Sequence, residues 1–176
     1  MVVLRLTSGD VVHSVWIPGL AGKTDMIPGR ETLMTVRATQ AGVYREQCME
    51  FCGLSHALMA FDVVAMEPAA FDRWLAEQGA TASAVVSPGR AAFACYGCGA
   101  CHAVRGTGEG GRIGPDLTHF GSRGSLAAGV LRPTEANVAA FIRRPDRFKP
   151  GVRMPAFAAM PASNAHAIAR YLTGLR

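Results

Sequence analysis

Long apolar runs, lysine and aromatic side chains are all scarce in this chain of 176 residues. No stretch of about 18 apolar residues occurs, and the first residues, MVVLRL, are too short and too soon charged for a signal peptide. The given sequence therefore predicts neither a membrane span nor a leader. Only 2 of the 18 basic residues are lysines, and aromatic residues make up 7% of the chain. Because no basic cluster is interleaved with aromatics, the net charge of +5 does not indicate a nucleic-acid partner.

Charge is spread unevenly along the chain. Residues 1–70 contain 5 Lys+Arg and 7 Asp+Glu, whereas residues 90–176 contain 12 and 4. Between them, the segment from Gly79 to Gly89 is small, uncharged and aperiodic, which is typical of an interdomain linker. We therefore expect two domains, at 1–67 and 90–176, joined by a helix and linker over 68–89. Their opposite fields favour docking on each other or on partners of opposite charge.

The first domain has the pattern of strands. Runs rich in β-formers, separated by turn residues, predict strands at Val2–Thr7, Val11–Ile17, Glu31–Ala38, Val43–Gln47 and Phe61–Met66. An all-β sandwich is the expected fold. After Pro68, a good first helical residue, Phe71 and Trp74 fall on one helical face, and Gly79 can end that helix.

The second domain has the pattern of helices. We expect them at Arg90–Cys98, at Thr134–Arg144 behind a threonine cap, and at Ser163–Leu175, where apolar residues recur at helical spacing. The predicted fold is therefore a small all-α domain.

Soft metal ligands are concentrated in the stretch QCMEFCGLSHALM, residues 47–59. Cys48, Cys52, His56 and Met59 provide two thiols, an imidazole and a thioether, a set that suits copper in both of its common oxidation states. The alternatives are a disulfide between Cys48 and Cys52, a zinc site, or cysteines buried as small hydrophobes. We favour copper, because zinc rarely uses methionine and a disulfide leaves His56 and Met59 without a role.

This stretch resembles the binuclear copper A loop of cytochrome c oxidase subunit II. Upstream, SGDVVHSVWIP at residues 8–18 and GKTDMIPGR at residues 22–30 are similar to the segment that supplies that family's other histidine. The resemblance implies a cupredoxin-like sandwich and the following ligand roles: Cys48 and Cys52 bridge both coppers, His13 and His56 bind one each, Met59 is a weak ligand, and Glu50 contributes its backbone carbonyl. Two bridging thiolates in a rigid loop would share one electron with little rearrangement.

The second domain carries the independent motif C-x-x-C-H at Cys98, Cys101 and His102. In c-type haem attachment, the two thiols add to the haem vinyl groups and the histidine becomes the proximal iron ligand. The segments IGPDL at 113–117 and RMPAF at 153–157 resemble the haem-packing turn and axial-methionine loop of small class I cytochromes c. By that resemblance, the Pro115 carbonyl fixes the imidazole and Met154 completes a His/Met iron site.

Several other residues need an interpretation. Met160 also precedes a proline and competes as axial ligand, but we favour Met154 and assign Met160 to the core. Cys95 is interpreted as a buried or merely tolerated thiol. His119 and His166 lack ligand-like neighbours and are assigned to a loop and to a solvent-facing helix position. Trp16 is assigned to the sandwich core or to the vicinity of the site.

A copper A domain followed by a cytochrome c domain resembles subunit II of caa-type terminal oxidases. The resemblance implies an electron-transfer subunit of a respiratory oxidase, which takes electrons from cytochrome c or the bc complex through its own haem c to copper A and on to subunit I. The chain shows no catalytic acid–base constellation, so oxygen reduction would belong to another subunit. The expected location is the periplasm or outer face of the bacterial plasma membrane, in contact with subunit I and other oxidase subunits.

Two features of that family are missing from the given sequence: the two N-terminal membrane helices and the first, aromatic-rich strand. We therefore expect an N-terminally truncated sandwich that reaches the membrane through the complex or through an absent anchor. The alternative is a soluble copper A/haem c electron carrier, or a subunit of a nitric oxide or nitrous oxide reductase system, because copper A also occurs in those enzymes.

Overall fold

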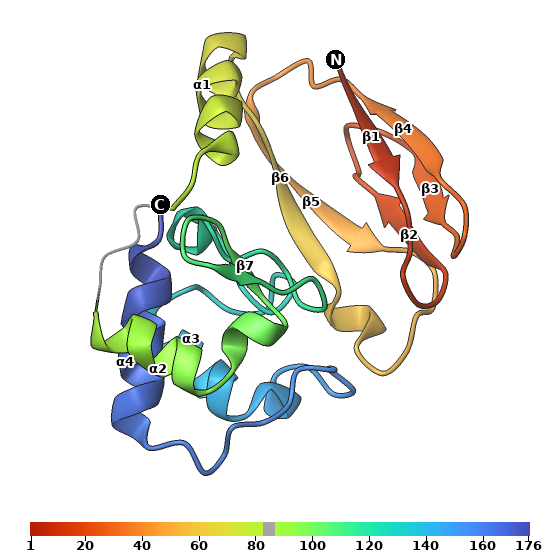
Figure 1. Ribbon diagram of the computed structural model, residues 1–176. Coiled ribbons are helices and arrows are strands. Elements are labelled where there is room, and N and C mark those ends of the chain that lie inside the picture. The colour runs from red at the N-terminus through yellow and green to blue at the C-terminus, as the bar shows by residue number, and fades with distance from the viewer. Residues whose placement is uncertain (83–86) are drawn as a thin grey trace.

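The computed structural model describes residues 1–82 and 87–176. Strands dominate the first part of the chain and helices the second, and the two parts lie side by side (Figure 1). Residues 83–86 of the expected linker lie outside the described residues. Among the described helices, none combines the length and the apolar character that crossing a membrane requires.

The N-terminal part contains two antiparallel sheets. Strands β1 (Val2–Leu6) and β4 (Thr32–Val36) form one pair. The other sheet has the order β3-β2-β5-β6, with bounds Lys23–Met26, His13–Trp16, Gly42–Cys48 and Ala60–Ala65. Val15, Ile17, Met34 and Val36 form the buried core between the sheets.

Helix α1 (Pro68–Gly79) leads away from this sandwich. It begins at its proline as expected, but none of its side chains is buried, and Trp74 and Leu75 are exposed. The C-terminal end of α1 contacts the second domain, because Arg105 Nη2 donates to the carbonyl oxygen of Gln78 at 2.6 Å. Ala82 is buried in the core of the second domain. The start of the expected linker is therefore held against that domain.

The C-terminal part is built around helix α4 (Ala162–Gly174), which packs against α2 (Pro88–Cys95) and α3 (Glu135–Arg143). Gly89 lies at the crossing of α2 and α4, where a β-carbon would meet the Ala167 carbonyl oxygen at 2.1 Å, so only glycine allows this approach. Phe93 packs edge-on against Tyr171 in the core. Side-chain oxygens of Ser87 and Thr134 accept from backbone N–H groups and cap α2 and α3.

Most expected elements are confirmed, within a few residues at their ends. The five expected strands are present, as are the helix after Pro68, the three helices of the second domain and the threonine cap. The sequence missed β3 and two short strands of the second domain, β7 (Ala103–Val104) and β8 (Glu109–Gly110). Helix α2 ends at Cys95, earlier than expected, because Gly97 turns the chain with a φ of 69°.

Candidate functional site

The loop between β5 and β6 brings the soft ligands of the first domain together. Cys48 ends β5 and pairs across the sheet with Val15 in β2. His13 begins the same strand two residues earlier, so its side chain lies on the same face as that of Val15. The loop then turns back through a 3-10 turn at His56–Leu58 and re-enters the sheet at Ala60. Sheet register thus places His13, far away in sequence, beside this loop, residues 49–59, which we call the cysteine loop.

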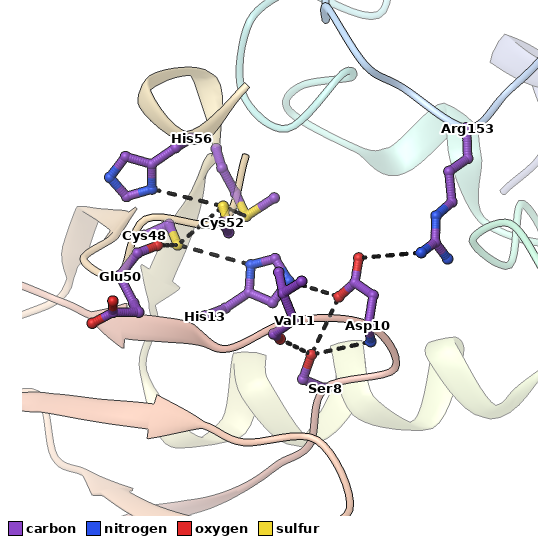
Figure 2. A network of polar contacts seen from close by, with 10 residues as sticks. Ser8, Asp10, Val11, His13, Cys48, Glu50, Cys52, His56 and Arg153 are labelled. Atoms are coloured by element: carbon purple, nitrogen blue, oxygen red, sulfur yellow. Dashed lines mark hydrogen bonds and ion pairs between the residues drawn. The ribbon is translucent and has the colours of Figure 1, made fainter. Parts of the chain in front are cut away.

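The donor atoms form one chain of close neighbours (Figure 2). Cys48 Sγ lies 3.8 Å from Cys52 Sγ and 3.9 Å from His13 Nδ1. Cys52 Sγ lies 3.7 Å from His56 Nδ1 and 3.8 Å from Met59 Sδ. The Glu50 carbonyl oxygen lies 3.3 Å from Cys48 Sγ. All six residues expected to hold copper are therefore in one cluster.

These separations fit metal coordination better than a disulfide. A disulfide requires sulfurs about 2.05 Å apart, whereas Cys48 and Cys52 are free thiols at 3.8 Å. Two donors on one tetrahedral metal at about 2.0 to 2.3 Å lie roughly 3.3 to 3.8 Å from each other. The cluster offers more donors than the four of one structural zinc ion. Its residues fit a binuclear copper group.

Electrostatics at the cluster favour a thiolate at Cys48. Burial, the largest single effect, works against ionisation, but contacts with the backbone of Ser14 and Glu50 and with the histidines outweigh it and lower the pKa of Cys48 to about 7. Burial together with the neighbouring Cys48 sulfur raises the pKa of Cys52 to about 11. One thiol of the pair therefore loses its proton readily, and a soft cation favours the second ionisation.

A hydrogen bond with Asp10 orients the imidazole ring of His13. His13 Nε2 lies 2.9 Å from Asp10 Oδ1, which leaves Nδ1 directed at Cys48 (Figure 2). Burial opposes protonation of His13, but its hydrogen bonds with Asp10 and Cys48 prevail and raise its pKa. The hydrogen bond from His13 in turn lowers the pKa of Asp10. Sequence reasoning gave Asp10 no role, although a carboxylate three residues before a ligand histidine was a usable signal.

The second cluster follows Gly97. Cys98 lies in a 3-10 turn at Cys98–Ala100, and Cys101 and His102 follow directly. His102 Nδ1 lies 2.8 Å from the Pro115 carbonyl oxygen and donates to it, so Nε2 is the basic nitrogen that can bind iron. A β-carbon at Gly114 would meet the His102 ring at 2.4 Å, so backbone packs directly on the imidazole. Free thiols and an oriented histidine fit covalent haem attachment.

The two candidate axial methionines have different surroundings. Met160 is 3% exposed and belongs to the hydrophobic core. Met154 is only partly buried and packs against the edge of that core, as does Phe157. Met154 therefore lies in a loop at the boundary of the core, and its role as the axial ligand stays a prediction.

The remaining singled-out residues lie outside both clusters. Cys95 is exposed, in the last turn of α2 on the face turned away from the core, so of the two interpretations the buried thiol is wrong and the merely tolerated thiol remains. His119 Nε2 lies 3.1 Å from the Ala80 carbonyl, and His166 lies 3.1 Å from the Glu135 carboxylate. Trp16, half-buried in β2, pairs with Gln47 of β5, next to the copper-ligand candidate Cys48.

The cysteine loop contacts the second domain, including the loop that leads to Met154. Ser55 Oγ, in the cysteine loop, donates to the Pro150 carbonyl oxygen at 2.6 Å. A β-carbon at Gly151 would lie 3.4 Å from Leu54 Cδ1, so the backbone of the second loop faces the Leu54 side chain of the first. Farther along, Ala60 N donates to the Ala128 carbonyl at 3.2 Å. The methionine loop, residues 149–154, therefore lies directly against the cysteine loop.

Comparison with known proteins matches two successive parts of the chain to two different families. The family model described as the cytochrome c oxidase subunit II periplasmic domain matches residues 1–66, and the cytochrome c family model matches residues 86–176. Cytochrome c oxidase subunit 2 of Alkalihalophilus pseudofirmus is 38% identical over 99% of this chain and 52% of its own length. The Bacillus subtilis protein of the same name is 34% identical over 99% of this chain and 53% of its own.

The chain thus spans about half the length of the curated relatives it matches. A solved structure, the periplasmic domain of subunit II of cytochrome oxidase from Bradyrhizobium japonicum, is 32% identical, with a TM-score of 0.41 over 43% of this chain and 54% of that one. The two family matches agree with the fold, in which strands dominate the first part of the chain and helices the second. The chain belongs to the cytochrome c family through its C-terminal domain, and the region before that domain matches the family model of the cytochrome c oxidase subunit II periplasmic domain.

Proposed function

We propose that the chain is the electron-transfer portion of subunit II of a respiratory haem–copper oxidase. Its C-terminal domain receives an electron from cytochrome c or the bc complex, and its N-terminal domain passes the electron to subunit I, where oxygen is reduced. The proposed location is the periplasm or outer face of a bacterial plasma membrane, within a complex of oxidase subunits.

The residues have distinct tasks in this proposal. Copper is held by His13, Cys48, Glu50, Cys52, His56 and Met59, and haem by Cys98, Cys101, His102 and Met154. When bound, these groups supply reversible one-electron transfer. The chain holds the ligands in a preset arrangement: the sheet fixes His13 and Cys48, Asp10 orients one imidazole and the Pro115 carbonyl orients the other.

One observation carries the proposal: the cysteine loop and the methionine loop are in contact within a single chain. Ser55 and Leu54 of the first loop meet Pro150 and Gly151 of the second. Contact between loops that carry proposed ligands of copper and of haem would bring the two redox groups near each other without an external partner. Such an arrangement favours electron transfer within one molecule over two metal-binding sites that act independently.

Intramolecular electron transfer tests this directly. A chain loaded with copper and haem is given less than one electron per molecule by flash photoreduction, and the haem and copper absorption bands are followed. We expect the electron to redistribute between the bands at a rate independent of protein concentration. A rate proportional to concentration, or no redistribution, would contradict transfer within the chain.

The oxidase is favoured over a free carrier by the names of the full-length relatives, all cytochrome c oxidase subunit 2 among those compared above. In cells that produce the chain, mild detergent extracts separated by native electrophoresis should place it in a large band that also reduces oxygen. Migration alone in the soluble fraction, or with a nitric oxide or nitrous oxide reductase, would favour the alternative.

A further inference from the structure

Asp10 connects the two domains through its two carboxylate oxygens. Oδ1 accepts from His13 Nε2 at 2.9 Å and lies 3.3 Å from Ser8 Oγ, both within the copper domain. Oδ2 faces the other domain, where Arg153 Nη2 lies 3.8 Å away (Figure 2). The same carboxylate therefore contacts a copper-ligand candidate on one side and the neighbour of Met154 on the other.

The surrounding contacts hold these groups in register. Arg153 follows the turn at Pro150 and Gly151, which is pinned to Ser55 and Leu54 of the cysteine loop. Gly151 has a φ of 77°, a conformation in which a side chain would be strained. The turn thus fixes where the arginine leaves the loop, while the long side chain itself is 79% exposed and Asp10 38% exposed. An ion pair this exposed is weak and sensitive to salt.

Charge gives the contact a chemical consequence. A carboxylate hydrogen-bonded to a ligand imidazole increases the negative field at the metal and favours its oxidised form. A guanidinium on the other oxygen of the same carboxylate reduces that field. Arg153 is thus placed to affect the copper domain from the haem domain by way of Asp10.

Resting on the proposed function, we propose that Arg153 is a positioning residue that docks the methionine loop on Asp10 and, through Asp10, raises the affinity of the copper site for an electron. Arg153 pairs with the Asp10 carboxylate of the same chain and acts on the copper site only through Asp10, which contacts His13. Docking and tuning are then two effects of one ion pair.

The docking part is tested on the full chain without metal or haem. Arg153→Lys keeps the charge and introduces an amine, so a zero-length carbodiimide should link that amine to Asp10, and mass spectrometry of the digest identifies the joined peptides. Asp10→Asn should abolish the link. Arg144→Lys is the matched control, because Arg144 pairs with Asp146 in its own loop at 2.6 Å and should yield only a link within the C-terminal domain.

The tuning part is tested on the loaded chain by spectroelectrochemistry of the copper band. Arg153→Gln should lower the ratio of reduced to oxidised copper at a fixed potential by up to about fivefold, the range of an exposed ion pair. In the Asp10→Asn background the same substitution should have little effect, and about 1 M salt should remove it, since the Debye length is then about 3 Å. Arg153→Lys should restore most of the wild-type ratio, and Arg144→Gln should leave it unchanged.

The outcomes separate this inference from the proposed function. A chain that binds no copper or haem overturns the proposed function, while the cross-link still decides whether Arg153 docks on Asp10. Absence of that link, when the control link forms, overturns docking. An equal effect of Arg153→Gln with and without Asp10, or none at all, overturns tuning through Asp10 even if electron transfer occurs as proposed.

Discussion

Gly89→Ala should destabilise the cytochrome domain by forcing two helices apart. The new β-carbon would lie 2.1 Å from the Ala167 carbonyl oxygen and 2.7 Å from Tyr171 Cβ, and contacts under 3.0 Å are essentially never observed. Because the obstacle is backbone, no change of rotamer relieves it, and α4 must move by about 1 Å relative to α2. Overpacking of this kind costs about 3 kcal/mol at the upper end of its usual range, and the gain in helix propensity returns at most about 1 kcal/mol.

The net loss of about 2 kcal/mol corresponds to a melting temperature lower by roughly 8 to 16 °C for a domain of this size. Circular dichroism at 222 nm follows the helices. Tryptophan fluorescence reports on the first domain and α1, because both tryptophans, Trp16 and Trp74, precede residue 82. Only the helical transition should move appreciably.

Gly174→Ala is the matched control, because Gly174 ends α4 and a β-carbon there meets no atom within 4 Å. That variant should melt at or slightly above the wild-type temperature. If Gly89→Ala also melts no lower than wild type, the helices are not in the close contact described, and the reasoning from the crossing fails.

Three pairs of substitutions test other parts of the structure. Met154→Ala should abolish the sulfur-to-iron charge-transfer band in the near infrared while haem stays attached, whereas Met160→Ala, in the core, should keep the band and lose about 2 to 5 kcal/mol of stability; the reverse would make Met160 the axial ligand. Cys48→Ser should remove the mixed-valence copper spectrum, and Met59→Leu should only shift the potential; an intact spectrum in Cys48→Ser would contradict the bridging role. Ala128→Gly should stabilise the chain by up to about 1 kcal/mol in thermal melts, since Ala128 has a φ of 58°, while Ala140→Gly in α3 should lose about 1 kcal/mol; a loss in Ala128→Gly would show that the turn is not strained.

Features that depend on local chemistry were predictable from the sequence. The positions of five strands, the helix start at Pro68 and the cap at Thr134 depend on neighbouring residues, and the structure confirms each of them. The short β3 was missed because Lys23-Thr-Asp-Met lacks the apolar alternation of a strand, and its pairing with β2 supplies the hydrogen bonds that stabilise it.

Features that depend on tertiary arrangement were not predictable in the same way. The C-x-x-C spacing of Cys95 and Cys98 does not indicate which of the two faces solvent, because that depends on how α2 rotates against α4. The contact of Asp10 with Arg153 requires the docking of two domains, and neither residue stands out alone. The candidate ligands were found because two short motifs carry most of them, although the placement of His13 beside Cys48 follows only from the register of β2 and β5.

The central claim, that one chain carries both redox groups, is tested most directly by their stoichiometry. The chain, produced with haem maturation and loaded with copper, is subjected to elemental analysis and to denaturing electrophoresis with a haem stain. The account predicts two coppers per chain and a haem that stays with the polypeptide through denaturation. A single zinc ion with no copper, or a haem lost on the gel, would contradict it.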